Sequence, residues 1–201
     1  MHEREFVKFF YELGMLKRRK HDGYLLAGAS PCEISSIAEH SFRAAAIAFV
    51  LARMEKCKDP YRVSVMALFH DIEETRIPDI NKVANRYTKG FDKERLLKEQ
   101  LDERLGEIGK EIRELRERVN YRYEDNLASL IAKDADYLEQ ALSAKELYEK
   151  GYESMQDWIN NIGKALRTKS ALKMWNVLQE VKSYEWWEGL KKIDTFRKNE
   201  D

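Results

Sequence analysis

Residues 60–74 read PYRVSVMALFHDIEE, an apolar segment that runs directly into the pair His70-Asp71. Pro60 suits the first turn of a helix, where its missing N–H would have no partner. Apolar side chains lie on most sides of the expected helix, which spans roughly residues 60–73. A helix of this kind is normally buried in the centre of a domain. We therefore expect the segment to form the middle of the fold and to hold His70-Asp71 inside it.

Further helices are predicted on both sides of this segment. Apolar side chains recur every three or four residues, and helix breakers are scarce, with nine glycines and three prolines in 201 residues. The predicted helices span residues 3–18, 35–56, 93–119, 124–149 and 154–182. Ser35 or Ser36 suits the cap of the second of these helices. No segment shows the alternation of a strand, so an all-α fold is expected.

Length and charge favour a single domain without a polyanionic partner. The 36 basic and 36 acidic side chains leave no excess positive charge for nucleic acid or a membrane surface. No apolar run approaches the roughly 18 residues of a membrane span, and Cys32 and Cys57 cannot form a disulfide framework. We expect one cytoplasmic domain over residues 1–201, in which residues 150–201 form a C-terminal helical extension packed on the rest.

The predicted helix over residues 93–119 favours self-association. Its leucines and isoleucines step by three or four residues, and its other faces are almost wholly charged. This pattern is typical of a helix that lies on its own domain or on a partner subunit. A homodimer is therefore expected.

Several polar side chains lie on the apolar faces of the expected helices. His40 lies on an apolar stripe, His70-Asp71 ends the most apolar helix, and Asp134 and Asp136 lie among leucines and alanines. Burial of such groups is costly unless they are paired, and one divalent cation would satisfy them together. Imidazole and carboxylate donors suit Mn, Fe, Co, Ni or Zn. Helical periodicity favours Asp134 as the last ligand, with Asp136 as the alternative.

Each of these residues also has an ordinary explanation. A lone His on an apolar face is commonly a hydrogen-bonded core residue, and both His and Asp occur at helix ends. Asp134 or Asp136 taken alone suits a cap or a salt bridge to Lys133 or Arg122. The combination favours a metal site because three separate helices each offer a ligand.

The same residues resemble a known family. Ala38-Glu39-His40-Ser41, His70-Asp71-Ile72-Glu73-Glu74 and Lys133-Asp134-Ala135-Asp136 resemble the H…HD…D signature of the HD-domain metal-dependent phosphohydrolases, which are helical bundles. The resemblance covers about residues 5–145. It is closest to the 5′-deoxynucleotidase branch, whose members hydrolyse deoxyribonucleoside 5′-monophosphates. It implies one divalent transition metal ion bound by His40, His70, Asp71 and Asp136.

The resemblance also implies two catalytic residues. The branch has a Glu three residues after the HD pair and a further Asp near a Pro, and Glu74 and Asp79, beside Pro78, match these positions. Glu74 would then orient or deprotonate the attacking water. Asp79 would protonate the leaving oxygen or hold the ribose 3′-hydroxyl.

Substrate-binding residues are expected in the segment before the first His. Leu16-Lys17-Arg18 and Gly23-Tyr24 resemble a strip of the branch that carries Arg and Trp, with Tyr24 where the branch often has Trp. No Arg stands beside it at Gly23. Arg18, Arg19 and Lys82 are therefore the cations expected to contact the phosphate.

The expected activity is release of phosphate from (deoxy)nucleoside 5′-monophosphates through a metal-activated water. One alternative is an HD hydrolase of a dNTP, a cyclic nucleotide or a stringent-response nucleotide, although a triphosphate would need a more basic pocket. Another alternative is a non-catalytic helical interaction protein with a vestigial metal site. The charged helix over residues 93–119 and the tryptophans Trp175, Trp186 and Trp187 favour this last reading.

Overall fold

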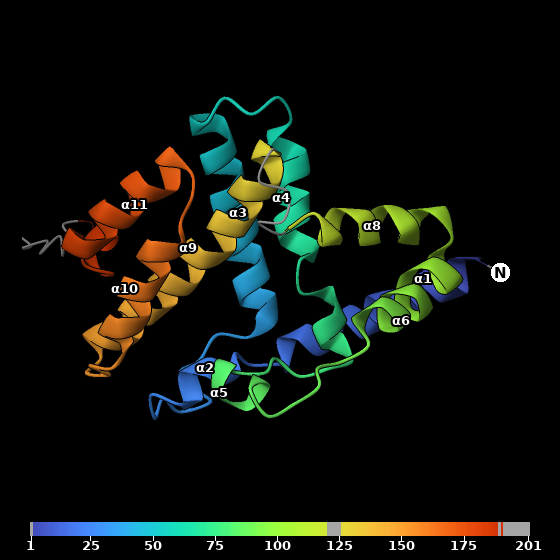
Figure 1. Ribbon diagram of the computed structural model, residues 1–201, viewed down its shortest axis with the longest axis horizontal. Coiled ribbons are helices and arrows are strands. Elements are labelled where there is room, and N and C mark those ends of the chain that lie inside the picture. The colour runs from blue at the N-terminus through green and yellow to red at the C-terminus, as the bar shows by residue number, and fades with distance from the viewer. Residues whose placement is uncertain (1, 120–125, 189, 191–201) are drawn as a thin grey trace, which may run out of the picture.

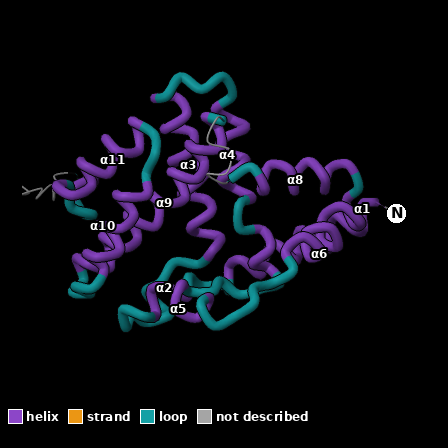
Figure 2. The backbone as a smooth tube through the Cα atoms, viewed as in Figure 1, coloured by secondary structure: helices purple, strands orange, loops and turns teal. Residues whose placement is uncertain are grey.

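The protein is built from helices (Figures 1 and 2). The computed structural model describes residues 2–119, 126–188 and 190, and within these ranges it contains no strand, only an isolated bridge between Lys20 and Ser36. The elements are α1 (His2–Leu13), η1 (Gly14–Lys17), α2 (Asp22–Leu25), α3 (Ile37–Met54), α4 (Pro60–Phe69), η2 (Ile72–Thr75), α5 (Lys82–Asn85), α6 (Lys93–Leu97), η3 (Lys98–Asp102), α7 (Glu103–Leu105), α8 (Glu107–Glu117), α9 (Leu127–Glu149), α10 (Met155–Ala165), α11 (Lys169–Glu180) and η5 (Glu185–Trp187). The all-α prediction is confirmed. None of the described helices has the length and apolar character needed to cross a bilayer.

Helices α3, α4 and α9 form the centre of the fold (Figure 1). Local sequence begins each of them, because the side chains of Ser36, Asp59 and Asn126 cap their N-termini and Pro60 occupies the first turn of α4. Such caps typically contribute about 1 kcal/mol each. Alanines along all three helices are fully buried, which allows close approach of the backbones. They include Ala44, Ala48, Ala52, Ala67, Ala132, Ala135, Ala141 and Ala144.

Helix α4 is central, as predicted, but it ends earlier than expected. Val63, Met66 and Ala67 are almost completely buried. The α-helix stops at Phe69, and the chain continues through His70-Asp71 into the 3₁₀ turn η2. The two polar residues therefore lie at a junction where the backbone changes direction inside the protein.

The prediction of one continuous helix over residues 93–119 is wrong. The chain passes from α6 through the π-helical turn η3 into α7, and then reverses at Gly106, whose φ of 61° favours glycine. Helix α8 returns so closely that a Cβ on Gly109 would lie 2.1 Å from the Leu101 carbonyl oxygen. Leu101 and its apolar neighbours pack within the chain, against Phe9 of α1. The homodimer inferred from this segment stays a prediction.

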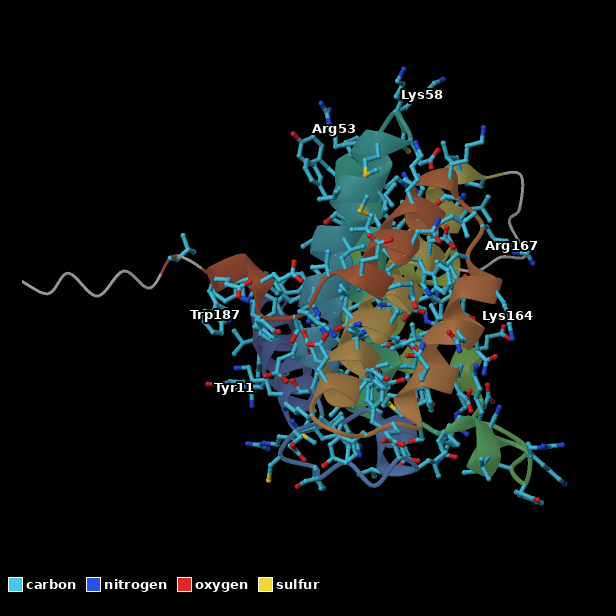
Figure 3. All side chains as sticks on the ribbon, turned by 90° about the vertical axis from the view of Figure 1, so that its left-hand side faces the viewer. Tyr11, Arg53, Lys58, Lys164, Arg167 and Trp187 are labelled. Carbon is cyan, nitrogen blue, oxygen red and sulfur yellow. The ribbon has the colours of Figure 1, made fainter. Side chains whose placement is uncertain are left out.

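The predicted helix over residues 154–182 is divided into two helices, α10 and α11. The chain is extended at Leu166, and Thr168 then caps α11 by accepting the Ala171 N–H. Asp134 of α9 holds this turn, because its carboxylate accepts the backbone N–H groups of Arg167 and Thr168 and the Thr168 hydroxyl. Lys164 and Arg167 lie at the outer edge of the molecule near this turn (Figure 3).

The C-terminal helices share the main core. Met155 and Ile159 of α10 and Leu178 of α11 belong to the same buried cluster as Leu51 of α3 and Leu138 of α9. Helix α10 also contacts α2, where the Trp158 and Tyr24 rings lie 5.6 Å apart, centre to centre. Residues 191–201 of the predicted C-terminal extension lie outside the described residues.

Candidate metal centre

Four side chains from α3, α9 and the end of α4 converge at the centre of the fold. His40 Nε2 lies 3.0 Å from His70 Nε2, and His70 Nε2 lies 3.0 Å from Asp71 Oδ2. Asp136 Oδ1 lies 3.3 Å from His40 Nε2 and 3.5 Å from His70 Nε2, and Asp71 Oδ2 lies 3.7 Å from His40 Nε2. Two ligands about 2.1 Å from one cation, at about 90–110° to each other, are roughly 3.0–3.5 Å apart. The ligand atoms of His40, His70 and Asp71 lie close enough together for a single ion, and Asp136 Oδ1 lies beside both imidazoles as a fourth candidate ligand.

Hydrogen bonds on the far side of each imidazole determine which nitrogen carries the proton. His70 Nδ1 lies 2.6 Å from the Ala67 carbonyl oxygen, and His40 Nδ1 contacts Glu139 Oε2. Both partners are acceptors, so both Nδ1 atoms donate, and in the neutral rings both Nε2 lone pairs face the centre. With the carboxylates of Asp71 and Asp136, the centre then contains only acceptors. A divalent cation fits this donor set.

A second layer of polar groups orients His40. Glu139 is almost completely buried and accepts hydrogen bonds from Arg43 Nε at 2.9 Å and from the Ser143 hydroxyl at 3.0 Å. Burial opposes its ionisation, but the hydrogen bond to His40 and the charge of Arg43 prevail and lower the pKa of Glu139. Carboxylate–histidine pairs of this kind hold metal-binding imidazoles in one orientation.

The centre attracts positive charge. Burial disfavours the imidazolium of His40, yet hydrogen bonds to Asp136 and Glu139 raise the pKa of His40 to about 9. Burial likewise opposes charge on His70, but the carboxylates of Asp71 and Asp136 raise the pKa of His70 well above its ordinary value. Without a cation, protons on the imidazoles balance the carboxylates.

Protons and metal ions should therefore compete, and this competition predicts a pH dependence. The pKa of His40 is raised from 6.5 to about 9, so its stabilising charge is fully present below about pH 6.5 and is lost as the pH rises through 9. In the metal-free protein, the melting temperature should fall over this interval, and Mn²⁺ should raise it more at about pH 8.5 than at about pH 6. Thermal unfolding with EDTA or with Mn²⁺ at each pH measures this difference. An equal metal-induced shift at both pH values would contradict it.

Glu74 lies beside the centre with an unsatisfied oxygen. It belongs to η2, is 8% exposed, and its buried Oε2 has no hydrogen-bond partner among the described residues. Burial, with the nearby charges of Asp71 and Asp79, raises the pKa of Glu74 to about 10. A carboxyl group of this kind is suited to exchange a proton with, or to hydrogen-bond, a water or substrate that enters the pocket.

A pocket of about 250 Å³ opens over Asp71 and Asp136. Of the other predicted site residues, Glu74, Asp79, Tyr24 and Lys82 line it, whereas Arg18 and Arg19 do not. The described lining residues are His21, Gly23, Tyr24, Asp71, Glu74, Asp79, Ile80, Asn81, Lys82, Lys133, Asp136, Tyr137, Gln140 and Trp158. Its volume is somewhat below the roughly 300–1,000 Å³ typical of pockets for drug-sized ligands.

Two predicted residues are already engaged by the protein. Tyr24 is 2% exposed, and its hydroxyl donates to the Gln140 carbonyl oxygen at 3.1 Å. Asp79 Oδ2 accepts the Asp22 N–H at 3.0 Å and lies 3.4 Å from His21 Nδ1. Tyr24 thus supports the pocket wall, while Asp79 anchors the loop that carries α2.

The lining residues that sequence reasoning did not assign to the site include Lys133, His21 and Trp158, although Lys133 was suggested as a salt-bridge partner for Asp134 or Asp136. Lys133 Nζ lies 2.7 Å from Asp136 Oδ2 and 4.6 Å from the centre of the Tyr137 ring. The three-residue spacing of Lys133 and Asp136 on one helix is a signal for this pair. His21 and Trp158 carried no comparable signal, because His21 precedes α2 and Trp158 lies in α10, so both are far from the metal ligands in the sequence.

The structure separates Asp134 from Asp136. Asp136 faces the two imidazoles, whereas Asp134 binds the turn between α10 and α11. Periodicity favoured Asp134 because that carboxylate is completely buried among apolar neighbours, but backbone N–H groups satisfy it.

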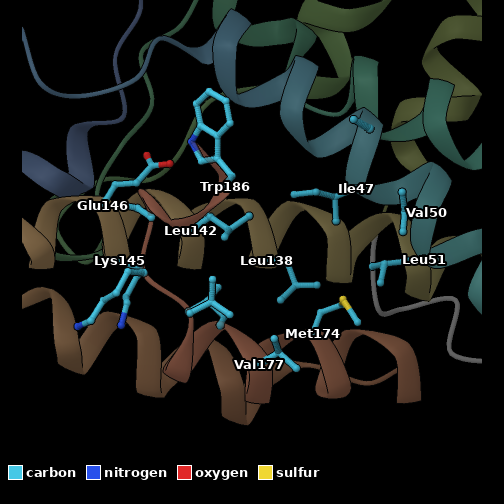
Figure 4. Close-up of a pocket in the computed structure, with 15 residues that line it drawn as sticks. Ile47, Val50, Leu51, Leu138, Leu142, Lys145, Glu146, Met174, Val177 and Trp186 are labelled. Atoms are coloured by element: carbon cyan, nitrogen blue, oxygen red, sulfur yellow. The ribbon is translucent and has the colours of Figure 1, made fainter. Parts of the chain in front are cut away.

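A larger cavity of about 520 Å³ lies elsewhere, between α3, α9 and α11 (Figure 4). Its lining is largely apolar, including Val50, Leu142, Met174 and Val177. Its described lining residues include no histidine and none of the four converging ligands. Size alone would select this cavity, but two of the candidate metal ligands, Asp71 and Asp136, line the smaller pocket.

Comparison with known proteins assigns the family. The sequence profile of the HD domain matches residues 13–175. The crystal structure of a structural-genomics target is 31% identical, with a TM-score of 0.73, and the alignment covers 92% of this chain and 99% of that chain.

Two archaeal proteins of known structure are also similar. A predicted coding region from Archaeoglobus fulgidus is 26% identical with a TM-score of 0.61, over 92% of this chain and 99% of that chain. A protein from Pyrococcus horikoshii OT3 is 26% identical with a TM-score of 0.65, over 86% of this chain and 97% of that chain. No curated protein gives a significant match. The chain belongs to the HD domain family of metal-dependent phosphohydrolases.

Proposed function

We propose that the protein is a metal-dependent phosphomonoesterase that releases phosphate from (deoxy)nucleoside 5′-monophosphates. The observation that carries this proposal is the acceptor-only set of His40, His70, Asp71 and Asp136, of which Asp71 and Asp136 line a small pocket. The resemblance of the H…HD…D motif, Glu74 and Asp79 to the 5′-deoxynucleotidase branch supports the choice of substrate.

The four residues would hold one divalent transition metal ion. Such an ion lowers the pKa of a bound water and polarises a phosphoryl oxygen. Glu74 lines the pocket, and its buried Oε2 has no hydrogen-bond partner among the described residues, which supports a role for its carboxylate in orienting the attacking water and accepting its proton. The metal charge would favour the ionised form of Glu74 that this role requires.

Cations in the pocket would stabilise the phosphoryl group. Lys82, one of the three cations suggested by the sequence, lines the pocket, and Lys133, which also lines it, would take the role suggested for Arg18 and Arg19. The ammonium group of Lys133 would then offset the negative charge that develops on the phosphoryl oxygens. Asp79 lies near His21, where it could hold a sugar hydroxyl or supply a proton to the leaving oxygen.

The same observations rank the alternatives. Lys82 and Lys133 are the only lysine or arginine side chains among the described lining residues, which disfavours a triphosphate. A non-catalytic interaction protein would not need the unsatisfied Glu74 oxygen beside the metal ligands.

A metal-by-substrate matrix tests the proposal. Metal-stripped protein is supplied with Mn, Co, Mg or Zn and assayed for phosphate release from nucleoside monophosphates, triphosphates and cyclic nucleotides. We expect metal-dependent release with monophosphates as the best substrates. Folded, metal-loaded protein that releases no phosphate from any of them would overturn the proposal, and a preference for another class would replace the substrate.

A further inference from the structure

The proposed function leaves open which part of the pocket receives the organic portion of the substrate. We propose that Trp158 of α10 is the surface on which the planar base of the nucleotide stacks, so that the C-terminal helices supply a specificity-determining residue. This inference rests on the proposed function. It assigns base recognition to α10, whereas the metal ligands belong to α3, to α9 and to the junction that follows α4.

The indole of Trp158 has a prepared position in the pocket wall. A Cβ on Gly23 would lie 2.6 Å from Trp158 Cη2 and 3.0 Å from Cζ2, so the indole occupies space that only glycine leaves empty. The Tyr24 ring lies 5.6 Å from the indole, centre to centre. Gly23 and Tyr24 thus support the indole, which in turn lines the pocket.

The other aromatic side chains that line the pocket are less available. Tyr24 is 2% exposed, and Lys133 Nζ lies over the Tyr137 ring at 4.6 Å from its centre. The His21 ring packs edge-on against His40, with centres 4.5 Å apart. Among the described lining residues, Trp158 therefore offers the best aromatic surface for a base. Aromatic side chains stack on nucleobases with little dependence on which base is present, because every base has a π-face.

Aromatic contacts connect Trp158 to the metal centre through two further rings. The Tyr24 ring lies 5.6 Å from Trp158, the His21 ring 5.7 Å from Tyr24, and the His40 ring 4.5 Å from His21, centre to centre. Trp158 also lines the same pocket as Asp71 and Asp136. A nucleotide carries its base and its phosphate at separate positions of one sugar, so one molecule in this pocket can present its phosphate to the metal ligands and its base to Trp158.

Comparison of two substrates with and without a base tests the inference. Kinetic constants are measured for the four common deoxynucleoside 5′-monophosphates and for 2-deoxyribose 5-phosphate, using wild type, Trp158→Leu and Trp158→Phe. Trp158→Leu should raise KM for the nucleotides by about tenfold or more and leave KM for the sugar phosphate unchanged. Trp158→Phe should restore most of the nucleotide affinity. An equal change for both substrate types would overturn the inference.

Two further variants distinguish loss of stacking from a general structural effect of the Trp158 substitution. Gly23→Ala should displace the indole and produce the same selective rise in KM. Trp175→Phe is the matched control, because Trp175 of α11 also covers a glycine, Gly163, but does not line the pocket. It should leave the ratio of the two KM values unchanged, and a change as large as that of Trp158→Leu would contradict the inference.

Equilibrium dialysis separates this inference from the proposed function. Deoxynucleoside monophosphate binding is measured on metal-free protein, without turnover. Binding by wild type that is lost in Trp158→Leu supports the stacking surface even if no phosphatase activity is found.

The kinetic comparison gives the opposite distinction. Release of phosphate from the sugar phosphate, with no selective effect of Trp158→Leu on KM, would support the phosphatase and overturn the stacking surface. Absence of nucleotide binding by wild type would also overturn it.

Discussion

Asp136→Asn is expected to give a folded protein that no longer holds stoichiometric metal. The substitution keeps the shape of the side chain but removes the negative charge that faces His40 and His70 at 3.3 and 3.5 Å. Changes in the outer shell of a metal site already cost roughly 10–100-fold in affinity, and loss of a ligand charge should cost more. Phosphatase activity should fall with the metal content. Elemental analysis of the purified variant measures this directly.

Asp134→Asn is the matched control, two positions away on the same helix. This variant should keep its metal but lose stability, because Asp134 accepts hydrogen bonds from the N–H groups of Arg167 and Thr168 at 3.0 and 2.6 Å. An amide cannot accept all of them, and the expected loss is roughly 2–5 kcal/mol in the free energy of unfolding. Denaturant unfolding measures that loss. Retention of full metal by folded Asp136→Asn would exclude Asp136 as a ligand.

Glu74→Gln is expected to lower kcat by about 10²-fold or more, the effect typical of a general acid–base group. The metal content should not change, because Glu74 lines the pocket but is not one of the four converging side chains. Glutamine keeps the size of the side chain but cannot accept the water proton. Single-turnover phosphate release, normalised to bound metal, measures the effect.

Glu73→Gln is the control for this prediction, with the same substitution one residue away. Glu73 is completely buried but points out of the pocket, where Lys93 Nζ at 2.9 Å and Arg116 Nε at 2.9 Å donate to it. Its substitution should lower stability because it weakens a buried ion pair, and should leave kcat per metal ion close to wild type. A Glu74→Gln variant with wild-type kcat would remove Glu74 from the mechanism.

Local chemistry made the starts of the central helices predictable. Ser36 forms a capping box with Glu39, and Pro60 with the cap Asp59 begins α4, because these signals depend only on residues a few positions apart. The continuous helices over residues 93–119 and 154–182 were wrong for the opposite reason. Their apolar spacing continues across both helix breaks. The first break depends on the close approach of Gly109 to Leu101, and the second on the hydrogen bonds that Asp134 accepts from Arg167 and Thr168.

Residue identity and order in this chain were enough to indicate an all-α fold and a candidate metal site built on His40, His70 and Asp71, because imidazoles and carboxylates on apolar helices need a shared partner. Helical periodicity alone did not distinguish Asp136 from Asp134, and the family resemblance pointed to Asp136. The tertiary structure shows the difference between the two buried carboxylates, because Asp136 faces the imidazoles and Asp134 binds the turn before α11. It also brought Trp158 to the pocket from α10. Periodicity reports which side of a helix is buried, but the partner on that side depends on how distant helices pack.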